Sequence, residues 1–228
     1  MVLFLFLSGV KRGVCFSFHF FCRFFVEFTV FQSEFFYFSK KMDFIDRIKQ
    51  LYRQGDALTR LIFLNVAVFV VLQIVLISFR LFNVSAEFIL PWLAVPADLY
   101  ELLSRPWTLI SYMFLHERFF HILFNMFALY WFGKLFQMYF NDKQLVALYL
   151  LGGLGGAVFY ILAYNLFPLF APSVAFSILL GASGSVMAII LAVAFRAPDM
   201  EMRLMFLGAV KLKYIALFVV LASFFGIT

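Results

Sequence analysis

The chain alternates between long apolar runs and short polar segments. The apolar runs cover about residues 61–79, 117–139, 143–166 and 175–195, and a fifth starts near Met205 or Leu212 and continues to the C-terminus. A helix needs roughly 20 mostly apolar residues to cross a bilayer. The pattern therefore predicts an all-α fold, a polytopic transmembrane helical bundle with about five spans.

The long connection at residues 80–115 has a different pattern. It is too apolar for a solvated loop, and its prolines interrupt it too often for a span. Its large aromatic residues are of the kinds that settle at the headgroup level of a membrane; they are Trp92, Tyr100, Trp107 and Tyr112. We predict an interfacial loop of short amphipathic helices.

Composition supports a membrane protein. The chain is 65% hydrophobic and 13% charged, with a mean hydropathy of +1.01, far from the balance of soluble domains. The net charge of +6 does not indicate nucleic-acid binding, because the cations lie between apolar runs and form no stripe among exposed aromatics. The lipid bilayer is the expected partner.

The cations predict an orientation. If the N-terminal side is cytoplasmic, the other face receives only Arg80, Arg105 and Arg118. The remaining twelve cations from residue 40 onward fall on the cytoplasmic face; they are Lys40, Lys41, Arg47, Lys49, Arg53, Arg60, Lys134, Lys143, Arg196, Arg203, Lys211 and Lys213. This asymmetry is typical of a cytoplasmic N-terminus. We expect a bacterial cytoplasmic (inner) membrane, with the second and fourth spans starting near the opposite face.

The N-terminal region divides into two parts. Residues 1–41 hold 13 of the 36 phenylalanines without a clear helical period, and they match a signal peptide poorly. They are either an extra membrane-associated helix or upstream sequence, with the true start at Met42. Residues 42–60 form a polar cytoplasmic segment ahead of the transmembrane domain at 61–228. Cys15 and Cys22 indicate neither a disulfide framework nor a metal site.

Three polar residues stand at or in the second span. His121 and Asn125 are four residues apart and share one helix face, and His116 precedes them by about one turn. Polar side chains at membrane depth point into the bundle or into a water-filled cavity. One interpretation is that they only hydrogen-bond neighbouring helices. The other is that they act in catalysis.

The fourth span carries "GASGS" at residues 181–185. Small residues let helices approach closely, so packing is one interpretation of Ser183. The hydrolase elbow G-x-S-x-G does not fit, because Ser185 stands where that motif needs glycine. A nucleophilic serine does require donors for an oxyanion, and His and Asn side chains supply them. The His/Asn pair and Ser183 are expected near the same membrane face.

These residues resemble the rhomboid family of intramembrane serine proteases over about residues 57–228. The resemblance implies that Ser183, in the family's G-x-S-G, is the nucleophile and that His121 and Asn125 assist the oxyanion. His116, Gly181 and Gly184 match supporting positions, and the connection at 80–115 resembles the family's membrane-embedded loop. Transmembrane protein substrates are implied, with no cofactor.

Two features depart from the family. Its loop often has Trp-Arg, whereas this chain has Trp107-Thr108 with Arg105 upstream. Its general base is a histidine on a sixth span, and the only other histidine here is His19. The chain is then either a fragment cut before the last span, with little turnover as given, or an inactive relative that binds membrane proteins. A transporter or channel is the weaker third hypothesis, since no acidic residue lies deep in a span.

Overall fold

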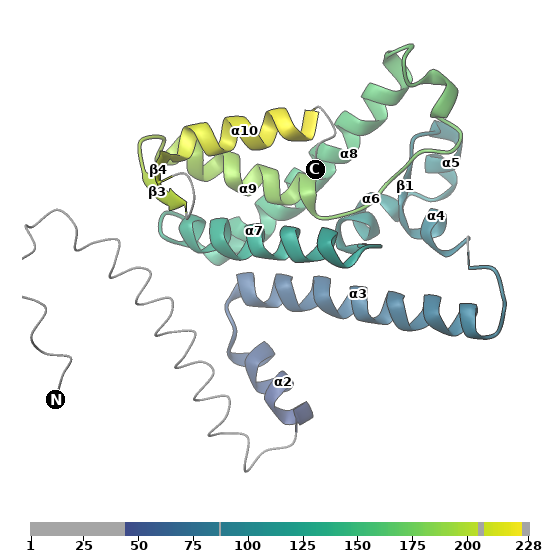
Figure 1. The fold of residues 1–228 in the computed structure, drawn as a ribbon, viewed down its shortest axis with the longest axis horizontal. Helices are drawn as coiled ribbons and strands as arrows, with labels where there is room; N and C mark the ends of the chain where they lie inside the picture. Colours follow the sequence, from purple (N-terminus) through teal and green to yellow (C-terminus); the bar gives the residue numbers. More distant parts are fainter. Residues whose placement is uncertain (1–43, 87, 205–207, 225–228) are drawn as a thin grey trace, which may run out of the picture.

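A computed structural model describes residues 44–86, 88–204 and 208–224. Helix α2 (Phe44–Gln54) lies in the polar segment, and the helices that follow the apolar runs are α3 (Ala57–Leu81), α7 (Phe119–Gln137), α8 (Asp142–Leu166), α9 (Ser183–Arg196) and α10 (Leu212–Phe224). In Figure 1, α3, α7, α9 and α10 lie along the long axis and α8 crosses obliquely. The helical-bundle prediction is confirmed. The Phe-rich segment at 1–41 lies outside the described residues.

The first three expected spans agree with α3, α7 and α8 to within a few residues. Among the described residues, these three helices are long and apolar enough to cross a membrane. The fourth expected span, 175–195, was wrong at its start, because α9 begins only at Ser183 and has 14 residues. Ile178 and Leu179 form a short strand instead, and Gly181 has a φ of +112°, which a right-handed helix does not contain.

The connection at 80–115 contains the short helices α4 (Ile89–Leu93), α5 (Leu99–Ser104) and α6 (Thr108–Ser111), then a 3₁₀ turn η2 (Tyr112–Phe114). The expected short helices are confirmed. A two-residue strand β1 (Val95–Pro96) pairs antiparallel with β2 (Ile178–Leu179), with Val95 opposite Leu179. A further 3₁₀ turn, η3 (Ala171–Ser173), precedes β2. The β1–β2 pair joins the loop to the segment that leads into α9.

A second antiparallel pair follows α9. Strand β3 (Glu201–Leu204) pairs with β4 (Gly208–Lys211), where the sequence predicted a polar link and a fifth span that could start near Met205. The alternative start at Leu212 is the one the structure has, as α10. Lys211 and Lys213 both contact the Asp199 carboxylate, at 3.2 and 2.9 Å. The paired strands and this carboxylate hold the chain as it turns from α9 into α10.

Most of the described cations lie at the end of the bundle where α3 and α8 begin and α7 and α9 end, and we call it the basic end; among them are Arg60, Lys134, Lys143 and Arg196. Lys134 near the end of α7 contacts Asp56 at the start of α3, with 2.9 Å between Nζ and Oδ2. The Arg196 guanidinium lies 5.1 Å from the centroid of the Tyr139 ring. In Figure 1, the β3–β4 pair lies at the left of the bundle, α2 lies below the left end of α3, and α4, β1 and α5 lie at the right.

Asp56 ties α3 to α7 at the basic end. Its Oδ1 accepts hydrogen bonds from the N–H and hydroxyl of Thr59, at 2.8 and 2.6 Å. Its Oδ2 accepts from Lys134 and from Gln137. Partial burial alone would raise the pKa of the Asp56 carboxyl, but these hydrogen bonds hold it well below its usual range. The ionised carboxylate therefore fixes the ends of α3 and α7 relative to each other.

A buried polar network crosses the core. The Asn65 amide of α3 donates to the Leu61 carbonyl at 2.8 Å and to the Tyr149 hydroxyl of α8 at 3.1 Å. The Tyr149 hydroxyl donates to the Met113 carbonyl at 3.0 Å. Both Asn65 and Tyr149 are fully buried, so these hydrogen bonds satisfy groups that would otherwise be costly in an apolar interior. The network joins α3 and α8 to the end of the loop.

Candidate active site

Ser183 is the first residue of α9, and it is exposed. The first turn of a helix has backbone N–H groups without helical acceptors and carries a partial positive charge. The N-cap residue, Ala182, supplies no side-chain hydrogen bond to that turn. The Ser183 hydroxyl therefore stands beside uncapped backbone donors, which is suitable for stabilising negative charge.

Gly181 shapes the turn that presents Ser183. Its φ of +112° is strained for any residue with a side chain. A Cβ at this position would lie 2.7 Å from Cε1 and 2.9 Å from Nε2 of His121. The Gly181 N–H donates to the Tyr112 carbonyl at 2.9 Å, which ties the turn to the loop. The structure thus places the His121 imidazole against the backbone two residues before Ser183.

His121 and Asn125 lie one turn apart on α7, as the spacing predicted. The Asn125 amide donates to the His121 carbonyl at 3.0 Å, and the residue is 9% exposed. This bond is local to the helix and uses one of the two amide N–H donors. The other N–H and the His121 ring remain as candidate donors to an oxyanion, and their catalytic role stays a prediction.

His116 is fully buried in the loop segment just before α7. Its Nε2 accepts the Ala182 N–H at 3.4 Å, and its Nδ1 lies 3.4 Å from the Phe114 carbonyl oxygen. Both contacts are satisfied by one neutral tautomer, with the proton on Nδ1. The His116 ring also packs edge-on against His121, with 5.1 Å between ring centroids. His116 therefore holds both the turn before Ser183 and the His121 ring.

Gly184 lies where α9 crosses α8. A Cβ on Gly184 would lie 3.4 Å from the Gly152 carbonyl oxygen and 3.4 Å from the Gly156 Cα. On the other side, a Cβ on Gly152 would overlap the methyl group of Ala188. The small residues therefore allow α8 and α9 to pack closely. This packing role is compatible with a catalytic role for Ser183 in the same segment.

Sequence reasoning missed two residues of this region. Tyr112, expected to lie at the headgroup level, is buried, and its hydroxyl donates to the Gly153 carbonyl of α8. Ser185 is buried on α9, and its Oγ has no hydrogen-bond partner among the described residues. Among the described residues, no three His, Cys, Asp or Glu side chains gather as metal ligands would.

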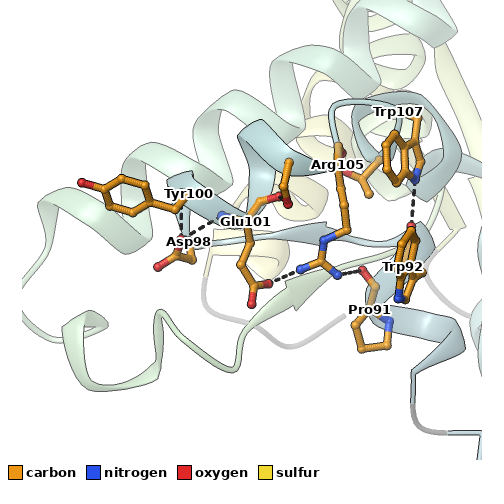
Figure 2. A network of polar contacts seen from close by, with 9 residues as sticks. Pro91, Trp92, Asp98, Tyr100, Glu101, Arg105 and Trp107 are labelled. Carbon is orange, nitrogen blue, oxygen red and sulfur yellow. Dashed lines mark hydrogen bonds and ion pairs between the residues drawn. The ribbon is translucent and has the colours of Figure 1, made fainter.

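The loop before α7 has its own anchors, shown in Figure 2. The Arg105 guanidinium pairs with Glu101 and donates to the Pro91 carbonyl at 2.9 Å. The Trp107 indole N–H donates to the Trp92 carbonyl at 2.9 Å, and the two indole rings stack with 5.9 Å between centroids. Arg105 thus joins α4 to α5. It does so although it precedes Trp107, whereas the arginine of the family's Trp-Arg pair follows the tryptophan.

The fold and the site together define a class: a polytopic helical membrane protein with a serine at the start of a short helix, beside a histidine from another helix. A family model described as Rhomboid domain matches residues 103–228. The chain belongs to the rhomboid family. It is 31% identical over 173 residues to RHOMBOID-like protein 12, mitochondrial, of Arabidopsis thaliana. The match covers 72% of this chain and 48% of the relative, so the chain spans about half that protein's length.

Proposed function

We propose that this protein is an intramembrane serine endopeptidase that cleaves transmembrane protein substrates. The Ser183 Oγ adds to the carbonyl carbon of the scissile peptide, and its proton passes to a general base. The resulting oxyanion accepts hydrogen bonds from the Ser183 N–H, His121 and Asn125. The C–N bond then breaks and the amine leaves with a proton. Water hydrolyses the acyl-enzyme ester and regenerates the serine.

The observation that carries the proposal is the Gly181 turn. This turn places Ser183 at an uncapped helix N-terminus while the His121 ring lies against the Gly181 backbone. A serine placed only for helix packing would not need a positive-φ glycine turn beside an imidazole. Preorganised donors of this kind are worth roughly 10²- to 10³-fold in rate per donor in serine proteases.

The general base is the group that the described residues do not supply. Their histidines are His116 and His121, and the Nε2 of His116 already accepts the Ala182 N–H. The proposal therefore assigns the base to a histidine on a further span, as the family resemblance implies. It predicts little or no turnover for residues 1–228 alone. Robust cleavage of a model substrate by these 228 residues, lost on Ser183→Ala, would contradict this assignment.

The test is covalent labelling by a fluorophosphonate probe of the full protein that the gene encodes, reconstituted in liposomes. We expect labelling that Ser183→Ala abolishes. Ser185→Ala is the matched control, since it removes a buried hydroxyl two residues away and should keep labelling. A folded protein that never labels, or equal labelling of the Ser183→Ala variant, would refute the peptidase proposal.

A second candidate is a catalytically inactive family member that binds membrane proteins. The absence of a third histidine from the described residues favours it. Under this hypothesis the full protein retains a transmembrane partner in pull-downs, does not label with the probe, and behaves identically after Ser183→Ala. Labelling at Ser183 would exclude it.

The orientation follows from the basic end. Cations concentrate on the cytoplasmic side of inner membranes, so we propose that the basic end is cytoplasmic and that Ser183 lies toward the other face. The Arabidopsis relative is mitochondrial by name, and a bacterial inner membrane for this chain stays a prediction. Cysteine labelling from either side of sealed vesicles, at Lys49→Cys and Tyr100→Cys, tests the orientation.

A further inference from the structure

A cavity of about 600 Å³ opens at the basic end, where α3 and α8 begin. The site described above uses none of its lining residues. Two lining residues are cationic, Arg60 of α3 and Lys143 of α8. The Ala57 N–H donates to Asp142 Oδ2 at 3.0 Å, which holds the two helix starts side by side.

The charged residues that line the cavity leave a net positive charge at its mouth, since Arg60 and Lys143 outnumber the one carboxylate, Asp142. The Asp142 carboxylate is held by neutral donors, with Oδ2 accepting from the Ala57 N–H and Oδ1 from the Gln137 amide, so it forms no ion pair with either cation. Arg60 donates through Nε and Nη2 to backbone carbonyls at the end of α2, which fixes its position without neutralising its charge. No described residue forms an ion pair with Lys143.

The wall of the cavity below these cations is apolar. It is formed in part by exposed or half-buried side chains of α3 and α8, among them Leu64, Val146 and Ala147. Cations at the start of two spanning helices and apolar side chains one turn further in match the two ends of a phospholipid. A small soluble anion would use the cations but would leave the apolar wall uncovered.

The helix beside the cavity supports the same occupant. The sequence of α2, FIDRIKQLYRQ, is strongly amphipathic and basic on balance, which is typical of helices that lie in a membrane interface. Leu51 is 40% and Tyr52 is 51% exposed, and Tyr52 lines the cavity. The mouth of the cavity therefore lies at the level where headgroups are found.

We propose that this cavity binds an anionic phospholipid, with the phosphate group between Arg60 and Lys143 and an acyl chain along the apolar wall of α3 and α8. The site is independent of the proposed peptidase chemistry. It would bind the α3–α8 pair to one leaflet of the membrane.

The first test counts retained lipids by native mass spectrometry of the full protein released from nanodiscs of phosphatidylcholine with phosphatidylglycerol. The wild type should keep a phosphatidylglycerol molecule. The double variant Arg60→Gln/Lys143→Gln should bind it about 30-fold more weakly, since each cation near an anionic surface contributes about fivefold. The control Lys49→Gln/Arg53→Gln removes two cations outside the cavity lining and should retain the lipid. Equal losses in both double variants would show general surface attraction and overturn the proposal.

The second test leaves the charges unchanged, and it also covers the case in which Arg60→Gln loosens α2. Ala147→Phe fills the apolar wall and should reduce retention of the lipid, whereas Leu151→Phe, one turn further along α8, should not. As a separate arm, inorganic phosphate is titrated into the phosphatidylcholine nanodiscs that contain phosphatidylglycerol. Lipid retention unaffected by Ala147→Phe, or displacement of the lipid by free phosphate at equal concentration, would refute a lipid site.

Discussion

Gly181 is the position where a single methyl group tests the site most directly. Gly181→Ala adds a Cβ to a backbone with φ +112° and places it 2.7 Å from the His121 ring. The backbone strain costs about 1–3 kcal/mol, and displacing a packed ring costs about 1–3 kcal/mol more. The expected loss in free energy of unfolding is therefore about 2–6 kcal/mol, a large part of the stability of an ordinary domain.

The two contributions separate in a double-mutant cycle with His121→Ala. Removal of the imidazole should relieve the steric part, so the double variant should be about 1–3 kcal/mol more stable than the sum of the single changes implies. The backbone strain should remain. Unfolding in mixed micelles with a rising fraction of SDS measures all four proteins.

Gly155→Ala is the matched control, because a Cβ on Gly155 meets no atom within 4 Å. Its stability should be unchanged or raised by up to about 1 kcal/mol, as alanine favours the helix. If Gly181→Ala were as stable as Gly155→Ala, or showed no coupling to His121→Ala, the turn would not have the geometry on which the site depends.

Three further predictions concern contacts that hold the helices together. Gly152→Ala should destabilise the fold by about 1–3 kcal/mol relative to Gly155→Ala in the same SDS titration, because its Cβ overlaps a methyl group of α9; equal stabilities would contradict the close helix contact. Tyr149→Phe should lower the free energy of unfolding by about 1–3 kcal/mol, because the buried Asn65 amide loses a hydrogen-bond partner. A loss smaller than that caused by the same change at an exposed tyrosine would argue against the network. The lowered pKa of Asp56 means that its carboxylate stabilises the fold above about pH 4 and that this contribution disappears as pH falls further. Asp56→Asn should lack that part of the pH dependence of the unfolding free energy. Identical pH profiles for the wild type and Asp56→Asn would refute this role of the carboxylate.

Local pattern alone identified the large features of this protein. The apolar runs predicted α3, α7 and α8 closely, since the length and hydropathy of a spanning helix are properties of a continuous segment. The i,i+4 spacing likewise placed His121 and Asn125 on one face of α7. The position of Ser183 near a histidine of another span came from motif resemblance, not from periodicity.

Contacts between distant segments were decided only in three dimensions. Strand β1 pairs with β2 across more than 80 residues, and this pairing, with the turn at Gly181, shortens α9 at its start. His116 reaches the Ala182 N–H, and Asn65 meets Tyr149; none of these partners is marked in the local pattern. A hydrogen-bond partner is chosen by which groups the packed helices bring within about 3 Å, and hydrophobic periodicity tells only which face of each helix turns inward. The sequence thus determined the spans and their order, whereas the packing of the helices decided the geometry around Ser183.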